Sequence, residues 1–146
     1  MNNYFLKIPL DLSKIAQGEP VSTCSRQESI AQFIMLIITS KYGELPGSDD
    51  FGSEIWELEF LQLANAHSWE ERVKESIEKA IVKYEKRLKE VKVTVSLDKV
   101  EDIDMKSTTK SYGVRKQAKI FVNGIMKGTD QHFNFNTKIF ISPISQ

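Results

Sequence analysis

A chain of 146 residues, 40% hydrophobic and 10% aromatic, is long enough to bury a core and too apolar to be globally disordered. Its formal net charge is zero, so it lacks the basic excess that marks nucleic-acid-binding proteins. The longest apolar run, residues 33–38, is too short to span a membrane, and the N-terminus lacks a signal-peptide pattern. The single cysteine, Cys24, cannot form an internal disulfide. We therefore expect a cytoplasmic globular protein without membrane insertion or nucleic-acid binding.

The charges are unevenly distributed along the chain. Residues 1–60 carry nine acidic residues against four basic ones, whereas residues 61–146 carry eleven against sixteen. Halves of opposite sign favour ordered association with a neighbouring protein, although chance can also produce such a distribution.

The predicted N-terminal arm covers residues 1–25, and the predicted single domain covers residues 26–146. Pro9 and Pro20 interrupt the arm, which we expect to be irregular. Ser25 and Glu28 have capping-box spacing, which predicts a helix over about residues 26–41. Apolar residues on almost every side of that helix indicate burial from several directions: Ile30, Ala31, Phe33, Ile34, Met35, Leu36, Ile37 and Ile38.

The middle of the chain predicts a loop and a second helix. Glycine and proline at four positions predict a structured loop over residues 43–53. Ser68 and Glu71 repeat the capping-box spacing and predict the start of the next helix. One apolar stripe indicates that a single face of this helix packs on the core: Val73, Ile77, Ala80, Ile81 and Tyr84.

Alternating apolar and polar residues predict three strands after the helices. The first covers about residues 91–97, and a charged connection over residues 98–113 follows it. The second is expected to continue through Asn123-Gly124 to a turn at residues 128–130, and the third covers about residues 132–142. This order predicts an α+β fold, in which two main helices pack on a three-stranded antiparallel meander. Both sheet edges are expected to be exposed and open to strand addition.

The stretch YEKRLKEVKVTV, residues 84–95, changes from helical to strand periodicity without a glycine or proline. In a continued helix, Glu85 and Arg87 would point about 200° apart, whereas in an extended chain they share one side. In the extended case they either form a carboxylate–guanidinium pair or each bind a charge of a partner. The remaining alternative is a solvated helix end.

The sequence offers little support for catalytic or cofactor chemistry. Cys24, His67 and His132 share no metal-ligand spacing, and no glycine-rich phosphate loop or nucleophilic triad is recognisable. A glycosidase would need two carboxylates about 5–10 Å apart across a cleft. Candidates lie in one acidic region, where acids more often face solvent or cap a helix: Glu44, Asp49, Asp50 and Glu54. We predict no catalytic residue, no cofactor and no metal.

Two motifs resemble those of the contractile-tail baseplate wedge proteins of phage tails and type VI secretion systems, which are sometimes labelled lysozyme-like. The resemblance covers about residues 26–142. The first motif is a buried helix followed by Thr-x-x-x-Gly-Glu and a Phe-Gly turn, here Thr39, Gly43, Glu44, Phe51 and Gly52. The second is Glu-Pro-Arg at a helix–strand junction, here Glu85-Lys86-Arg87.

The chain departs from the family pattern at two positions. Leu45 stands where the family usually has arginine, so an ion pair built on that arginine is not expected. Lys86 replaces the proline, so ring sterics do not hold the chain extended before Arg87.

The resemblance implies a structural protein rather than an enzyme. Family members hold other wedge subunits through the Glu/Arg motif and offer sheet edges on which the contractile sheath starts to polymerise. The implied partners are therefore wedge subunits and the sheath protein, the latter by strand addition. The implied protein-binding residues are Glu44, Phe51, Gly52, Glu85 and Arg87. The competing hypothesis is a lysozyme-like peptidoglycan glycosidase that uses the loop carboxylates.

Overall fold

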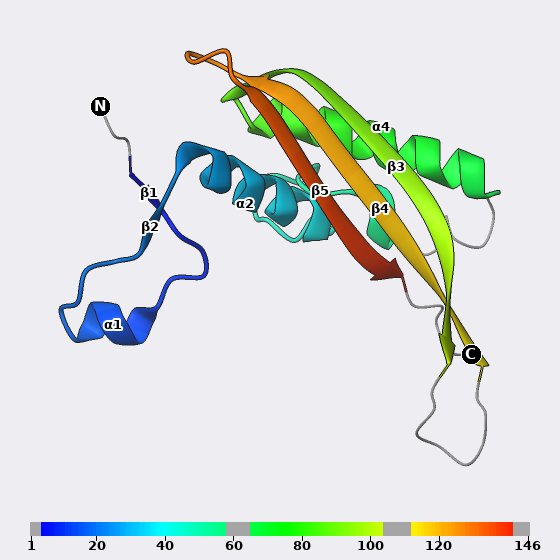
Figure 1. Cartoon of the computed structure of the whole chain (residues 1–146), viewed down its shortest axis with the longest axis horizontal. Coiled ribbons are helices and arrows are strands. Elements are labelled where there is room, and N and C mark those ends of the chain that lie inside the picture. The colour runs from blue at the N-terminus through cyan, green and yellow to red at the C-terminus, as the bar shows by residue number, and fades with distance from the viewer. Residues whose placement is uncertain (1–3, 58–64, 104–111, 142–146) are drawn as a thin grey trace.

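The computed structural model describes residues 4–57, 65–103 and 112–141 of the chain. Two long helices lie on one face of a three-stranded antiparallel sheet, and the N-terminal arm projects away from this body (Figure 1). The strand order is β3-β4-β5. The predicted α+β fold with a three-stranded meander is therefore confirmed.

Helix α2 covers Arg26–Thr39 and begins at the predicted capping box. The Ser25 hydroxyl accepts the N–H of Glu28 at 3.2 Å, and the Glu28 carboxylate accepts the N–H of Ser25 at 2.8 Å. The bond from the Ser25 backbone is the main cause that lowers the pKa of Glu28, because it stabilises the charged carboxylate. Isoleucines at helical spacing are buried on this helix: Ile30, Ile34, Ile37 and Ile38.

Helix α4 covers Ala66–Tyr84 and starts earlier than predicted. The side-chain oxygen of Asn65 accepts the N–H of Ser68 at 2.8 Å and so caps the helix. The prediction that Ser68 is the cap is wrong, because Ser68 lies in the first turn. Asn and Ser are both favourable caps, and local sequence could not distinguish two of them three residues apart.

The sheet is built from β3 (Leu88–Ile103), β4 (Tyr112–Met126) and β5 (His132–Ile141). Strand β4 continues through Asn123-Gly124, and the turn to β5 follows Met126, as predicted. The predicted connection over residues 98–113 is too long, since residues 98–103 pair with residues 112–117 in the β3–β4 register. Polar residues can form a strand where their backbone finds hydrogen-bonding partners on a neighbouring strand. The rest of that connection, residues 104–111, lies outside the described residues.

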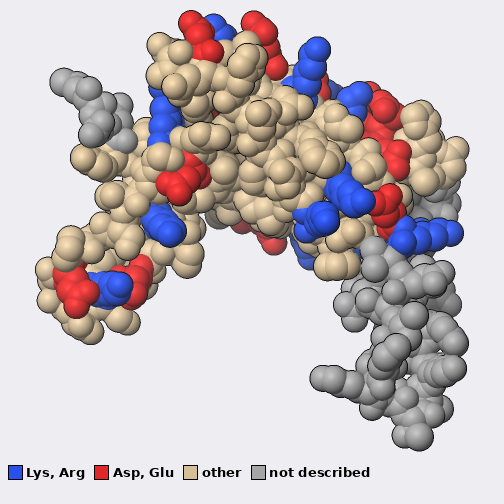
Figure 2. All heavy atoms as spheres, viewed as in Figure 1, with Lys and Arg blue, Asp and Glu red and all other residues tan. Residues whose placement is uncertain are grey.

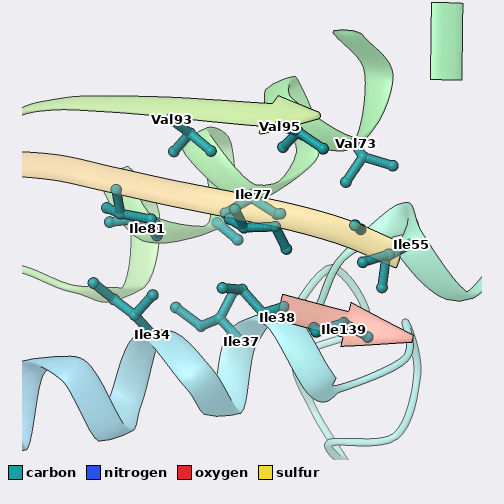
Figure 3. Close-up of a cluster of buried hydrophobic side chains, with 14 of the residues drawn as sticks. Ile34, Ile37, Ile38, Ile55, Val73, Ile77, Ile81, Val93, Val95 and Ile139 are labelled. Carbon is teal, nitrogen blue, oxygen red and sulfur yellow. The ribbon is translucent and has the colours of Figure 1, made fainter. Parts of the chain in front are cut away.

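The core lies between the two helices and one face of the sheet (Figure 3). The short helix η1 (Glu54–Trp56) adds Ile55 to it. Branched aliphatic side chains from both helices and β3 fill most of this space: Ile34, Ile37, Ile38, Val73, Ile77, Ile81, Val93 and Val95. Such one-sided burial is the physical reason for the alternating pattern in the strands.

The molecule presents few charges over its middle in the view of Figure 2, where charged side chains lie mainly towards the margins. Two phenylalanines of the sheet, Phe121 and Phe140, are about half exposed at 45% and 51%. Both belong to the strand positions that alternate with the buried ones. The outer face of the sheet thus combines two aromatic rings with exposed polar side chains such as Thr94, Asn134 and Asn136.

The N-terminal arm contains short elements where an irregular chain was expected. Strand β1 (Phe5–Leu6) pairs with β2 (Thr23–Cys24), and the short helix α1 (Leu12–Ala16) lies between them in the chain. The arm meets the body at α2, where the Gln32 side chain accepts the N–H of Ile8 at 2.9 Å. Several of its apolar side chains remain exposed: Tyr4, Leu6, Ile8, Leu10, Leu12, Ile15 and Val21.

The two edges of the sheet differ. Within the described residues, no strand pairs with the outer side of β5. Along the other edge, α4 packs beside β3 (Figure 1). The expectation of exposed edges therefore applies to β5, whereas α4 covers part of β3.

Candidate functional site

The second motif, Glu85-Lys86-Arg87, lies at the junction between α4 and β3. The helix ends at Tyr84, and Glu85 is its C-cap, with an N–H that donates to the Ile81 carbonyl at 2.8 Å. The backbone of Glu85 is no longer helical (φ −96°, ψ 87°), and β3 starts at Leu88. The chain has therefore left the helix before Arg87, so the side chains of Glu85 and Arg87 can meet.

Glu85 and Arg87 form a joined pair in which the carboxylate is buried. Glu85 Oε1 accepts the Arg87 backbone N–H at 2.9 Å and its Nε–H at 2.8 Å, while Oε2 accepts from Nη2 at 2.7 Å. Glu85 is 2% exposed, and the side chain of Arg87 is 27% exposed. Of the open alternatives, the carboxylate–guanidinium pair is the one the chain adopts. These bonds also hold the conformation before Arg87, where Lys86 imposes no ring constraint on the backbone.

Arg87 connects parts of the chain that are far apart in sequence. Its Nη1 donates to the Ser29 hydroxyl on α2 at 2.9 Å, and its guanidinium lies 5.3 Å from the centroid of the Phe5 ring in the arm. Its carbonyl accepts the N–H of Lys127 in the β4–β5 turn at 2.8 Å. The residue therefore joins α2, the arm, the turn and the α4–β3 junction.

The Phe-Gly turn of the first motif closes the C-terminal end of α2. Gly52 has φ +136°, and a Cβ added there would lie 2.5 Å from the Ser40 carbonyl oxygen. Ser53 donates its N–H to that oxygen at 3.1 Å. The Ile38 carbonyl accepts from the Ser53 hydroxyl at 2.9 Å and from Trp56 Nε1 at 3.0 Å. These bonds satisfy carbonyls that the end of a helix leaves without partners.

The two motifs meet through aromatic and polar contacts. The Phe51 ring lies 5.0 Å from the Tyr84 ring in an edge-to-face arrangement and 5.9 Å from the Phe33 ring. The Asp50 carboxylate accepts hydrogen bonds from Lys83 and from the Tyr84 hydroxyl. The bond from Lys83, followed by that from Tyr84, lowers the pKa of Asp50, and the same pairing raises the pKa of Lys83.

An apolar groove of about 330 Å³ opens beside this contact. Leu36 and Leu45 in its wall are 46% and 45% exposed. Glu44 lies at the groove and accepts the N–H of Lys41 at 2.8 Å, so it also closes a local turn. Leu45 adds apolar surface here. The lining consists of Phe33, Leu36, Ser40, Glu44, Leu45, Ser48, Phe51 and Tyr84.

Metal-binding clusters and membrane-spanning helices are both absent from the residues that the structure describes. No three His, Cys, Asp or Glu side chains come together there in a way that could hold a metal ion. None of the helices in the same residues is long and apolar enough to cross a membrane.

The model of the family described as baseplate wedge protein gp25 matches residues 24–120. The chain belongs to this baseplate wedge family. The matched region contains both motifs, α2, α4 and β3, and leaves most of the arm and all of β5 outside. Among curated proteins, none matches the sequence.

A solved structure shares the fold of this baseplate wedge protein. It is the 1.44 Å crystal structure of a protein from Geobacter sulfurreducens that is described as a tail lysozyme. The two are 15% identical with a TM-score of 0.54, and the match covers 86% of this chain and 100% of the other. At this identity the likeness concerns the fold alone.

Sequence reasoning missed several partners of the site residues. Ser29 and Phe5 contact Arg87, yet Ser29 is 58 positions away in the chain and nothing near it marks the contact. Asp50, a candidate glycosidase carboxylate by its place in the acidic region, instead pairs with Lys83 and Tyr84.

We expect Gly52→Ala to lower the free energy of unfolding by about 2–4 kcal/mol, because the new methyl group meets the Ser40 carbonyl in a backbone conformation that alanine disfavours. Gly47→Ala is the matched control, with φ +82° and nothing within 4 Å, and should lose about 1–2 kcal/mol. Urea unfolding measures both, and equal losses would contradict a close-approach role for Gly52.

We expect Glu85→Gln to lower the free energy of unfolding by about 1.5–3 kcal/mol, because an amide leaves the Arg87 guanidinium without its charged acceptor. Lys86→Ala changes the exposed residue between them and should stay within about 0.5 kcal/mol of the wild type. If both variants unfold at the same urea concentration as the wild type, the pair does not stabilise the junction.

Proposed function

We propose that this protein is a non-enzymatic structural subunit of the baseplate wedge in a contractile injection machine, either a phage tail or a type VI secretion system. In this role it acts in the cytoplasm, joins other wedge subunits and nucleates polymerisation of the contractile sheath. The observation that carries the proposal is the intact Glu85–Arg87 pair at the helix–strand junction, inside the region that matches the wedge family.

The proposed surface for wedge joining combines Arg87 with the neighbouring apolar groove. Glu85 is buried, so its role is to position the guanidinium, part of which remains accessible to a partner. Glu44 and Phe51 line the groove, and Gly52 holds the loop that forms its wall. Because its lining is largely apolar, the groove suits apolar side chains of another wedge subunit.

The proposed site for sheath nucleation is the outer edge of β5. An unpaired edge presents backbone N–H and C=O groups to which an extended segment of another chain can add. Strand β5 is ten residues long and is held by β4 along its inner side, so an added strand would extend a preformed sheet.

The glycosidase alternative has less support. The pKa of Asp50 is lowered by Lys83 and Tyr84, so Asp50 does not suit the general acid of such an enzyme, which needs a raised pKa. Glu44 accepts a backbone N–H within its own loop. The carboxylates are therefore used in local contacts that hold the loop.

We expect that deleting the gene abolishes sheath assembly and that the wild-type gene restores it. Arg87→Ala should lower the number of assembled baseplates by about tenfold, the usual scale for removing a central arginine from an interface. Lys86→Ala should restore assembly fully, since that side chain is exposed and lies outside the pair. Circular dichroism of the purified Arg87→Ala variant shows whether it is folded, so that a loss of assembly is not mistaken for a loss of folding. Normal sheaths without the protein would refute the proposal.

The enzyme alternative is tested directly on peptidoglycan. We expect the purified protein to release no soluble fragments, with Asp50→Asn behaving like the wild type. Fragment release by the wild type that disappears in Asp50→Asn would instead favour the glycosidase.

A further inference from the structure

Two glutamates of α4 occupy backbone amides of the neighbouring edge strand. Glu78 Oε2 accepts the N–H of Val93 at 3.3 Å, and Glu70 Oε1 accepts the N–H of Leu97 at 2.8 Å. Both amides belong to β3, whose described partner strand is β4 alone. The carboxylates therefore take the place that a further strand would fill.

The spacing of these contacts follows from the geometry of the two elements. Glu70 and Glu78 are eight residues apart, which is about 12 Å along a helix. Val93 and Leu97 are four residues apart, which is about 13 Å along a strand. The earlier glutamate binds the later amide, so α4 and β3 run in opposite directions. The two distances are similar enough for both hydrogen bonds to form at once.

Such bonds change what the edge can bind. In an antiparallel pair, alternate residues of an edge strand turn their N–H groups outward and so offer a template to another chain. Hydrogen bonds to a charged acceptor are stronger than those between neutral groups. An incoming strand at β3 would have to displace both carboxylates and the helix that carries them, whereas no described strand pairs with the outer side of β5.

We propose that Glu70 and Glu78 close the β3 edge and thereby direct strand addition to β5 alone, so that assembly on this protein proceeds in one direction. The identity of the added strand as sheath protein rests on the proposed function, but the closure of β3 does not. From its position in the sequence, Glu70 is expected only to stabilise the start of a helix through the helix dipole. Nothing in the sequence indicates a contact with β3.

Residue-resolved amide hydrogen exchange on the purified protein tests the closure. The Glu70→Ala/Glu78→Ala variant should exchange the amides of Val93 and Leu97 at least about tenfold faster than the wild type. Glu75→Ala, an exposed glutamate on the same helix, should leave both rates unchanged. Glu70→Gln/Glu78→Gln should restore most of the protection, because an amide oxygen can still accept. Unchanged exchange in the folded Ala variant would overturn the proposal. If the double variant does not fold, the exchange rate of the Leu97 amide in the single variant Glu70→Ala tests the proposal by the same criterion.

Cross-linking in the reconstituted baseplate tests which edge of the sheet receives the added strand. Cysteines are placed at exposed positions on the edge strands, Thr94→Cys on β3 and Asn136→Cys on β5, and are joined to added sheath protein by a short thiol–amine cross-linker. We expect cross-links from Asn136→Cys alone, and from both positions once Glu70 and Glu78 are alanine. Equal cross-links from both positions with the glutamates intact would overturn the proposal. Cross-links from neither position would refute sheath addition, while the exchange experiment still decides whether β3 is closed.

Discussion

The buried carboxylate of Glu85 is the constraint on which the rest of the structure depends. A carboxylate that is 2% exposed must find strong donors, because an unpaired buried charge is very costly. Arg87 supplies them from its backbone and from two guanidinium nitrogens. This arrangement requires the helix to end at Tyr84 and the strand to begin at Leu88. One pair of side chains thus determines where the helical half of the domain becomes the sheet.

The same guanidinium makes the junction a meeting point for the domain. It reaches Ser29 at the start of α2 and Phe5 in the arm, while the adjacent Tyr84 contacts the loop that closes the other end of α2. The two motifs therefore form one continuous unit rather than two separate sites. A unit with so many internal contacts suits a subunit whose proposed task is to hold other proteins in a fixed geometry.

The sheet adds an asymmetry to this framework. One of its faces is buried under the helices, and the other carries polar side chains with two exposed phenylalanines. Helix α4 lies along β3 and bonds two of its amides, whereas β5 has no strand on its outer side within the described residues. The edges thus differ in what they can bind, although their sequences alternate in the same way.

Sequence alone determined the features that depend on neighbours a few residues apart. The capping box of α2, the buried face of each strand and the turn after Met126 follow from local hydrogen bonding and periodicity. Tertiary structure decided the rest, namely Asn65 as the cap of α4, the extension of β3 beyond Leu97, and the partners of Arg87 and Glu70. Each of these depends on groups distant in the chain, or on a choice between equally good local caps. The partners of Arg87 and Glu70 come together only when the helices, the arm and the sheet pack, and local sequence does not encode that packing.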